Sequence, residues 1–268
     1  MAAVMQRTLA ILECLADHVG GMQIAALAQR LGMPLSAAHR LLAELAEHGY
    51  VRQSRERGEY VLTTRLVTLG LTYLKNAGVV DLCQPVLDAL AQSSGELVRL
   101  GVVDVDHLTW VAKAQGARSG LRYDPDMGID AQLSCTATGF AWLSTLPEAD
   151  AVALVTRQGL PQADRFGPNA PASVDAVLDA VRKARRQGYA MAVDTYTAGL
   201  SAVSAPIVRA DGAAVGVLAI SGPSVRLTQA KMRSLAASLL QAARDLAAAS
   251  GASPLFDRAW QARVPVPA

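Results

Sequence analysis

The chain has 268 residues, of which 51% are hydrophobic and 18% are charged, and its formal net charge is +2. This length favours two domains, and the apolar content excludes a disordered chain because it suffices to bury a sizeable core. The small net charge alone indicates no class of partner, because a nucleic-acid signal lies in where charges cluster.

The cysteines and histidines show no spacing typical of a metal site. Cys14, Cys83 and Cys135 lie far apart, and an odd number without a CxxC pair argues against disulfides and zinc. No run of ~18 apolar residues predicts a transmembrane helix. Residues 1–17 lack the pattern of a secretory signal. We therefore expect a cytoplasmic protein without cofactors and without membrane contact.

Three helices are predicted at the N-terminus, over about residues 5–17, 22–31 and 35–48, from apolar residues at helical spacing. Gly32 ends the second helix, and Pro34 suits the first turn of the third. The residues expected to face the core of this unit are Leu9, Leu12, Leu15, Ala16, Ile24, Leu27, Ala28, Leu31, Ala38, Leu41, Leu42 and Leu45.

Residues 50–62 then predict a strand, a basic turn and a second strand, with Gly58 supplying a turn of positive φ. Arg52, Arg55 and Arg57 cluster in this ribbon. Three helices followed by a two-stranded ribbon are typical of a winged helix-turn-helix, which we expect over residues 1–62.

In such a unit, the first residues of the third helix face base edges in the major groove of double-stranded DNA. Here they include Ser36, Ala37, His39 and Arg40, of which Arg40 suits a guanine or a phosphate. The three wing arginines suit phosphates or the minor groove. Gln6 and Arg7, which open the first helix, are further candidates for contact with the DNA backbone.

Each of these signals has an alternative interpretation. Arg40 lies one helical turn from Glu44, so the two side chains can form an ion pair instead. The wing arginines can form a solvated face, and Gln6 and Arg7 can have a plain surface role.

The rest of the chain alternates helices and strands, which predicts an α+β fold with a second, α/β domain. We expect a linker helix within a segment 63–79, a domain over 80–250 and a flexible tail over 251–268. The expected elements are a helix at 63–75, a helix at 80–93, a hairpin at 97–115, a short strand at 119–124, helices at 136–143 and 173–187, a hairpin at 201–222 around Asp211-Gly212, and a helix at 228–249.

Several stretches together resemble the IclR family of bacterial transcription regulators. They are residues 5–17, 24–51 and 58–70 in the first half, and 133–144, 185–208 and 220–228 in the second. The resemblance implies a winged helix, a linker helix and a GAF-like effector domain. It further implies a homodimer or homotetramer that binds near-palindromic operators of catabolic genes and responds to a small-molecule effector.

The resemblance also places an effector pocket between the sheet and the loops near 119–139 and 192–221. Family members that bind small oxo-acids carry an acid at position 192, a cysteine at 202 and a serine at 219, all of which are alanine here. The implied pocket residues are Leu121, Tyr123, Ala137, Thr138, Ala192, Ala202, Ala219 and Ser221.

The three alanines at positions 192, 202 and 219 indicate which kind of effector fits the pocket. A small hydrated acid such as pyruvate needs several placed polar partners, so their loss favours a larger, less polar effector such as an aromatic acid. The alternative is that the aromatic residues are core and that sensing has been lost. The candidate residues are Trp110, Tyr123, Phe140 and Trp142 for stacking on the ring, and Thr138, Ser221, Arg122 or backbone N–H groups for the carboxylate.

Three neighbouring positions also bear on the pocket. The family often has histidine at Ser134 and lysine at Phe140, so one candidate anion partner is missing here. Cys135 is either a redox-sensitive thiol or a small buried hydrophobe.

Two other classes of function are rivals to a DNA-binding regulator. An enzyme is not expected, because the chain has no GxSxG, no paired cysteines and no metal-ligand spacing. A co-regulator that binds protein instead of DNA is the second rival. The expected mechanism is a population shift, in which the effector favours one arrangement and the linker helix transmits it to the recognition helices.

Overall fold

The computed structural model describes residues 2–54, 58–125, 127, 130–160, 165–254 and 256. The chain divides into two compact units, Met1–Asn76 and Ala77–Ala268. The boundary falls inside the segment 63–79 that the sequence predicts as a linker.

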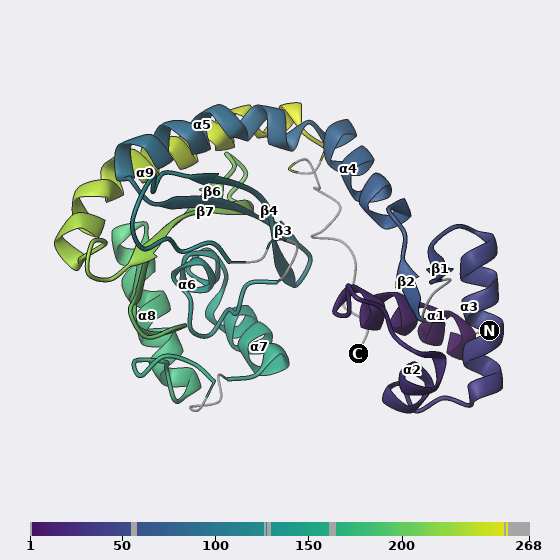
Figure 1. Ribbon diagram of the computed structural model, residues 1–268. Coiled ribbons are helices and arrows are strands. Elements are labelled where there is room, and N and C mark those ends of the chain that lie inside the picture. The colour runs from purple at the N-terminus through teal and green to yellow at the C-terminus, as the bar shows by residue number, and fades with distance from the viewer. Residues whose placement is uncertain are drawn as a thin grey trace. The chain divides into compact units, whose positions relative to one another are not determined.

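The N-terminal unit consists of three helices, a short antiparallel ribbon and most of a fourth helix (Figure 1). Strands β1 and β2 pair with Val51 opposite Leu62 and Gln53 opposite Tyr60. This is the winged helix-turn-helix that the sequence predicts. Its elements are α1 (Ala2–Ala16), α2 (Ile24–Arg30), α3 (Leu35–Glu47), β1 (Val51–Gln53), β2 (Tyr60–Leu62) and α4 (Arg65–Ala77).

The core of this unit follows the predicted faces of α2 and α3, whereas on α1 the prediction is confirmed for Leu12 and Leu15 and wrong for Leu9 and Ala16. Leu9 is 50% exposed and Ala16 is exposed, whereas Ile11 and Leu15 are buried. The buried stripe of α1 runs through Ile11, Cys14 and Leu15, at the i, i+3, i+4 spacing of one helix face. Leu9 lies outside that stripe.

The wing is fixed to the turn between α1 and α2. The backbone N–H of Met22 donates to the carbonyl of Tyr60 at 3.0 Å, and the N–H of Tyr60 donates back at 2.8 Å. Gly21 has a φ of +93°, and a Cβ there would lie 2.6 Å from Cγ1 of Val61. A larger residue at position 21 would therefore push the ribbon away.

The C-terminal unit is built on an antiparallel sheet of five strands among the described residues, in the order β4-β3-β7-β6-β5. The two predicted hairpins, β3–β4 and β6–β7, are confirmed. The elements are α5 (Val79–Ser94), β3 (Leu97–Asp104), β4 (His107–Gln115), α6 (Ala137–Leu143), α7 (Glu148–Gln158), α8 (Val174–Gln187), β5 (Ala190–Val193), β6 (Leu200–Val208), β7 (Ala214–Pro223), α9 (Gln229–Ala249) and a 3-10 turn at Ser250–Ala252.

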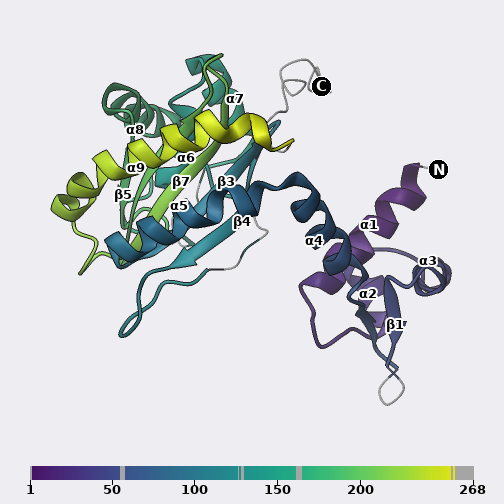
Figure 2. The same ribbon diagram turned by 90° about the horizontal axis from the view of Figure 1, so that it is seen from above.

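Helices cover both faces of this sheet. Helices α5 and α9 lie side by side on one face, and α6 lies on the other with α8 beside it (Figures 1 and 2). The central strand β7 is consequently buried along nearly its whole length. The fold is α+β overall, with an α/β second unit, as the sequence predicts.

The strand predicted at 119–124 is wrong, since these residues form a loop. Gly120 has a φ of +74°, which interrupts extended backbone. Helix α7 and strand β5 had no counterpart among the predicted elements. Beyond residue 250, Ser253 and Phe256 are buried, and the hydroxyl of Ser253 donates to the carbonyl of Ala77 at 2.6 Å. The remainder of the predicted tail, 257–268, lies outside the described residues.

Within the part of the chain that the structure describes, no helix is both long enough and apolar enough to cross a membrane.

Candidate DNA interface and effector pocket

Helix α3 presents the predicted DNA-contacting residues on the side away from the core. Ser36, His39 and Arg40 are exposed, and Ala37 is half-buried. The opposite side of the helix is held by four buried residues, which fix its rotation: Ala38, Leu41, Leu42 and Leu45.

The remaining candidates fall into two groups. Gln6 and Arg7 are exposed on α1, and Arg52 is exposed on β1. Arg55 and Arg57 lie outside the described residues.

The sequence also allowed Arg40 to form an ion pair with Glu44 on the same helix. Among the described side chains, no ion pair joins Arg40 to Glu44. The guanidinium of Arg40 is therefore free of the intrahelical partner that the sequence offered.

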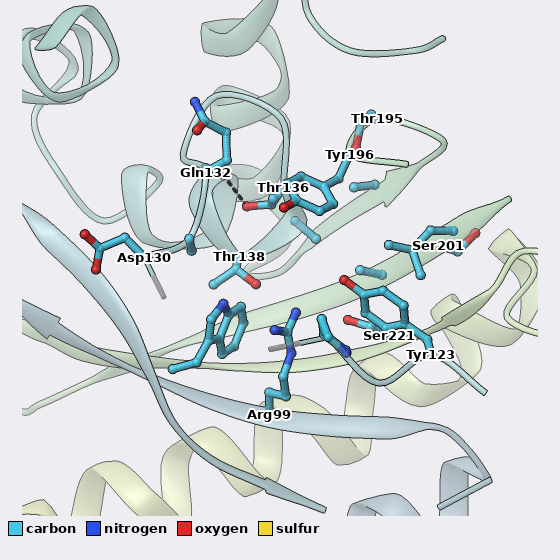
Figure 3. Close-up of a pocket in the computed structure, with 17 residues that line it drawn as sticks. Arg99, Tyr123, Asp130, Gln132, Thr136, Thr138, Thr195, Tyr196, Ser201 and Ser221 are labelled. Carbon is cyan, nitrogen blue, oxygen red and sulfur yellow. Dashed lines mark hydrogen bonds between the residues drawn. The ribbon is translucent and has the colours of Figure 1, made fainter. Parts of the chain in front are cut away.

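The C-terminal unit contains a cavity between the sheet and α6, closed by the loops that follow β4 and β5 (Figure 3). The centre of a water molecule can occupy about 50 Å³ of it. That is several times the roughly 10–15 Å³ that one water needs, so the cavity suits a compact ligand. Six of the eight predicted pocket residues line it, namely Tyr123, Ala137, Thr138, Ala192, Ala202 and Ser221.

The other two predicted pocket residues lie elsewhere. Leu121 is 66% exposed, because the loop at 119–124 turns its side chain to solvent. Ala219 is fully buried in β7, directly opposite Arg99 on β3 and Ser204 on β6. Its small side chain leaves room on the sheet for the long side chain of Arg99.

Two of the four candidate stacking residues, Trp110 and Tyr123, line the cavity. Phe140 and Trp142 do not, since both are packed in the core around α6 with exposures of 2% and 1%. Arg122 is exposed and lies outside the cavity.

Arg99, which was not predicted from the sequence, is only 7% exposed and enters the cavity from β3 (Figure 3). Its Cζ atom lies 3.7 Å from the centroid of the Trp110 ring and 5.8 Å from that of Tyr123. Burial lowers the pKa of Arg99. The available signal was a charged residue within an apolar strand, between Val98 and Leu100.

The Tyr123 hydroxyl is affected by the same environment. Burial raises the pKa of Tyr123, and the neighbouring charge of Arg99 opposes that rise. The phenol therefore stays protonated at neutral pH and can donate a hydrogen bond into the cavity.

Hydroxyl groups hold the start of α6 in place as one wall of the cavity. Oγ1 of Thr136 accepts from the N–H of Gly139 at 2.9 Å, which caps the helix. The hydroxyls of Thr138 and Ser204 lie 3.2 Å apart and join the helix to β6. A Cβ on Gly139 would lie 2.2 Å from the carbonyl oxygen of Leu133, so only glycine fits there.

Cys135, beside this wall, is fully buried, and burial raises its pKa to about 12. This favours the interpretation as a small buried hydrophobe over that of a redox-sensitive thiol. Ser134, where the family often has histidine, is also buried, and its hydroxyl donates to the carbonyl of Gly159 at 3.3 Å.

The described residues include no cluster of three or more potential metal ligands.

Two family models match the chain. The model of the IclR helix-turn-helix domain covers residues 4–55, and that of the bacterial transcriptional regulator IclR C-terminal domain covers residues 71–248. Among curated proteins, the acetate operon repressor of Salmonella typhimurium is 28% identical over 246 residues, which are 91% of this chain and 89% of the relative. The transcriptional repressor IclR of Escherichia coli is 26% identical over the same shares.

Solved structures agree in fold. A putative IclR transcriptional regulator from Silicibacter superposes with a TM-score of 0.77 at 21% identity, covering 92% of this chain and 95% of that one. An IclR homologue from Microbacterium hydrocarbonoxydans, complexed with 4-hydroxybenzoate, gives a TM-score of 0.73 at 20% identity, covering 91% and 99%. The two curated relatives named above are transcriptional repressors and not enzymes.

Proposed function

The chain belongs to the IclR family of bacterial DNA-binding transcription regulators, and we propose that it controls catabolic genes in response to a small aromatic or other weakly polar acid. In this proposal the acid occupies the cavity between the sheet and α6, and its binding changes the affinity for operator DNA. The cavity lining carries the proposal, because it combines aromatic side chains with three small alanines, Ala137, Ala192 and Ala202.

The lining supports a less polar effector than pyruvate. Where the oxo-acid binders of the family have an acid and a cysteine, Ala192 and Ala202 offer no hydrogen bond and leave space instead. Trp110 and Tyr123 provide flat apolar surfaces against which a ring can stack. The structural relative from Microbacterium hydrocarbonoxydans, whose ligand is 4-hydroxybenzoate, adds an example of such a ligand on this fold.

The DNA-binding half of the proposal assigns base and phosphate contacts to Ser36, Ala37, His39 and Arg40 on α3. The wing contributes Arg52, Arg55 and Arg57, and α1 contributes Gln6 and Arg7. Support comes from the exposure of those among them that the structure describes, and from the helix-turn-helix model that matches residues 4–55. Arginine and serine side chains form hydrogen bonds with the phosphates and the base edges of a DNA duplex.

We further assign a homodimer or homotetramer as the active form. Helix α4 supports it, because Val67, Leu69, Leu71 and Tyr73 are about half exposed or more. Apolar side chains gathered on one exposed helix typically mark a surface that another protein covers.

The DNA-binding half is tested with the full chain and duplexes selected from a random pool. We expect Arg40→Ala with Arg52→Ala to weaken binding and to lower the slope of log affinity against log salt by about one for each phosphate that is no longer bound. Arg186→Ala, at an exposed position of α8, is the matched control and should bind as the wild type does. Equal binding by the double variant would contradict the assigned contacts, and failure of the wild type to select any duplex would favour a co-regulator that binds protein.

The sensing half is tested by thermal melts with benzoate, 4-hydroxybenzoate and phenylacetate on one side, and with pyruvate and glyoxylate on the other. A ligand at about 100 times its dissociation constant stabilises the folded state by about 2.7 kcal/mol. We expect shifts with aromatic acids alone. Shifts with pyruvate or glyoxylate alone would contradict the proposed effector class, and no shift with any acid would indicate lost sensing.

A further inference from the structure

Arg99 carries a buried charge that the described part of the chain leaves uncompensated. Its guanidinium stays protonated at any physiological pH. Asp130 is the one acid described on the cavity lining, and its carboxylate accepts from Thr109 at 2.8 Å and lies 3.2 Å from His107. No described carboxylate forms an ion pair with Arg99. Since a buried charge without a partner is costly, an anion from outside the chain would complete this site.

The orientation of the guanidinium shows from which direction the anion must come. Trp110 covers one of its faces at 3.7 Å, so the donors point outward along the edge of the group, where the Tyr123 hydroxyl is a hydrogen-bonding neighbour. Nε of Arg99 is buried and has no hydrogen-bond partner among the described residues. A carboxylate approaching side-on places one oxygen on Nε–H and the other on an Nη–H, which is the strong bidentate arrangement.

The charge of the lining sets the charge of the ligand. Arg99 is the one cationic side chain described on it, and Asp130 contributes a negative charge. A single guanidinium balances a monocarboxylate, whereas a dianionic phosphate would keep an uncompensated charge beside Asp130.

The shape of the site then favours an aromatic acid. The carboxylate of a benzoate is conjugated with its ring, so a carboxylate held in the guanidinium plane also holds the ring in that plane, next to Trp110. Ala192 and Ala202, beside Ser221 on the sheet, leave the space that such a flat body needs.

We propose that Arg99 is the carboxylate anchor of the effector pocket, and that the pocket takes a planar aromatic monocarboxylate bound side-on. This inference rests on the proposed function, in which the cavity holds a small acid. It adds the residue that recognises the acid and the geometry of recognition.

The test is isothermal titration of the full chain with benzoate and with its neutral isostere benzamide. We expect the wild type to prefer benzoate, and Arg99→Gln to weaken benzoate binding roughly 10- to 100-fold while binding benzamide as the wild type does. Arg99→Lys keeps the positive charge but cannot form the two parallel hydrogen bonds of a guanidinium with a carboxylate. Its loss of benzoate affinity should therefore be intermediate. The matched control is Arg122→Gln, an exposed arginine outside the cavity, which should leave both affinities unchanged.

The outcomes separate this inference from the proposed function. Benzoate binding that is equal in the wild type and Arg99→Gln would overturn the anchor and leave an aromatic-acid sensor standing. Failure of benzoate to bind the wild type, or no preference over benzamide, would overturn both the anchor and the effector class, while operator binding is scored separately. If Arg99→Gln does not fold, judged by circular dichroism, Arg99→Lys decides, and wild-type affinity in that variant would overturn the anchor.

Discussion

Gly139 has a structural role that a single methyl group would disturb. It lies in the first turn of α6 against the backbone of Leu133, where an added Cβ would lie 2.2 Å from the carbonyl oxygen and 2.5 Å from Cα. Backbone atoms cannot move aside as a flexible side chain can, so α6 and the pocket wall would have to shift. We expect Gly139→Ala to lower the free energy of unfolding by about 1–3 kcal/mol and to weaken acid binding.

Urea denaturation followed by tryptophan fluorescence measures this change, because Trp110 and Trp142 both lie in the C-terminal unit. Gly251→Ala is the matched control, since a Cβ there meets no described atom within 4 Å. An unchanged urea midpoint for Gly139→Ala would show that the loop at Leu133 yields easily.

The cysteines give a second prediction at the scale of single residues. Burial raises the pKa of both Cys83 and Cys135 to about 12, which keeps both thiols protonated as the pH rises toward that value. At about pH 8 the thiolate fraction is then roughly one in ten thousand. We expect neither thiol of the native protein to react with iodoacetamide on a scale of minutes, as measured by mass spectrometry. The urea-denatured chain is the control, and rapid native labelling of Cys135 would revive a redox role.

At the scale of elements, an ion pair joins the turn between α5 and β3 to the segment between β7 and α9. Nε and Nη2 of Arg226 donate to Glu96 at 2.8 and 2.9 Å, across 130 positions of sequence. The two partners differ in environment, because the side chain of Glu96 is 6% exposed and that of Arg226 is 37% exposed. Removing one partner therefore has a different consequence from removing the other.

We expect Arg226→Met to cost about 3 kcal/mol of unfolding free energy, because it leaves a buried carboxylate without its cation. Glu96→Gln should cost about 1 kcal/mol, since Arg226 then turns to water. Urea denaturation of both variants and of the double variant measures the asymmetry. Equal losses of unfolding free energy in the two single variants would mean that Glu96 and Arg226 behave as a solvent-exposed ion pair.

Elements with strong local signals were predictable from the sequence. The turn from α2 to α3 carries Gly32 and Pro34, and the β6–β7 hairpin carries Asp211-Gly212, so local backbone preferences determine both. In the segment 119–124, Leu121 and Tyr123 alternate with other residues as in a strand, but the segment pairs with no strand of the described sheet. Composition alone cannot supply the missing partner strand.

The residues of the pocket were likewise only partly predictable from the sequence. Family resemblance placed Thr138, Ala192 and Ser221 on it, but the contact between Arg99 and Trp110 depends on strand register. A bulge between Leu100 and Gly101 shifts the pairing of β3 with β4, and this brings Trp110 opposite Gly101. Such a shift leaves no mark in apolar periodicity, so the anchor could be found only in three dimensions.

At the scale of the whole molecule, the proposed mechanism requires the two units to communicate through their covalent connection. Helix α4 ends at Ala77, Gly78 adopts a φ of +62°, and α5 begins at Val79. An effector that changes operator affinity must itself be bound more or less tightly when operator is present, by the same factor. We expect that factor to be about 5–150 in each direction.

Two titrations measure it: operator affinity with and without saturating benzoate, and benzoate affinity with and without operator. Inserting Gly-Gly after Gly78 should reduce both factors to about one while each binding reaction persists, because a flexible joint transmits no preferred arrangement. The same insertion after Gly212, in the exposed β6–β7 turn, is the control and should preserve the coupling. If the Gly78 insertion leaves both factors intact, the effector acts on the DNA-binding units by a route other than α4, such as contacts between protomers.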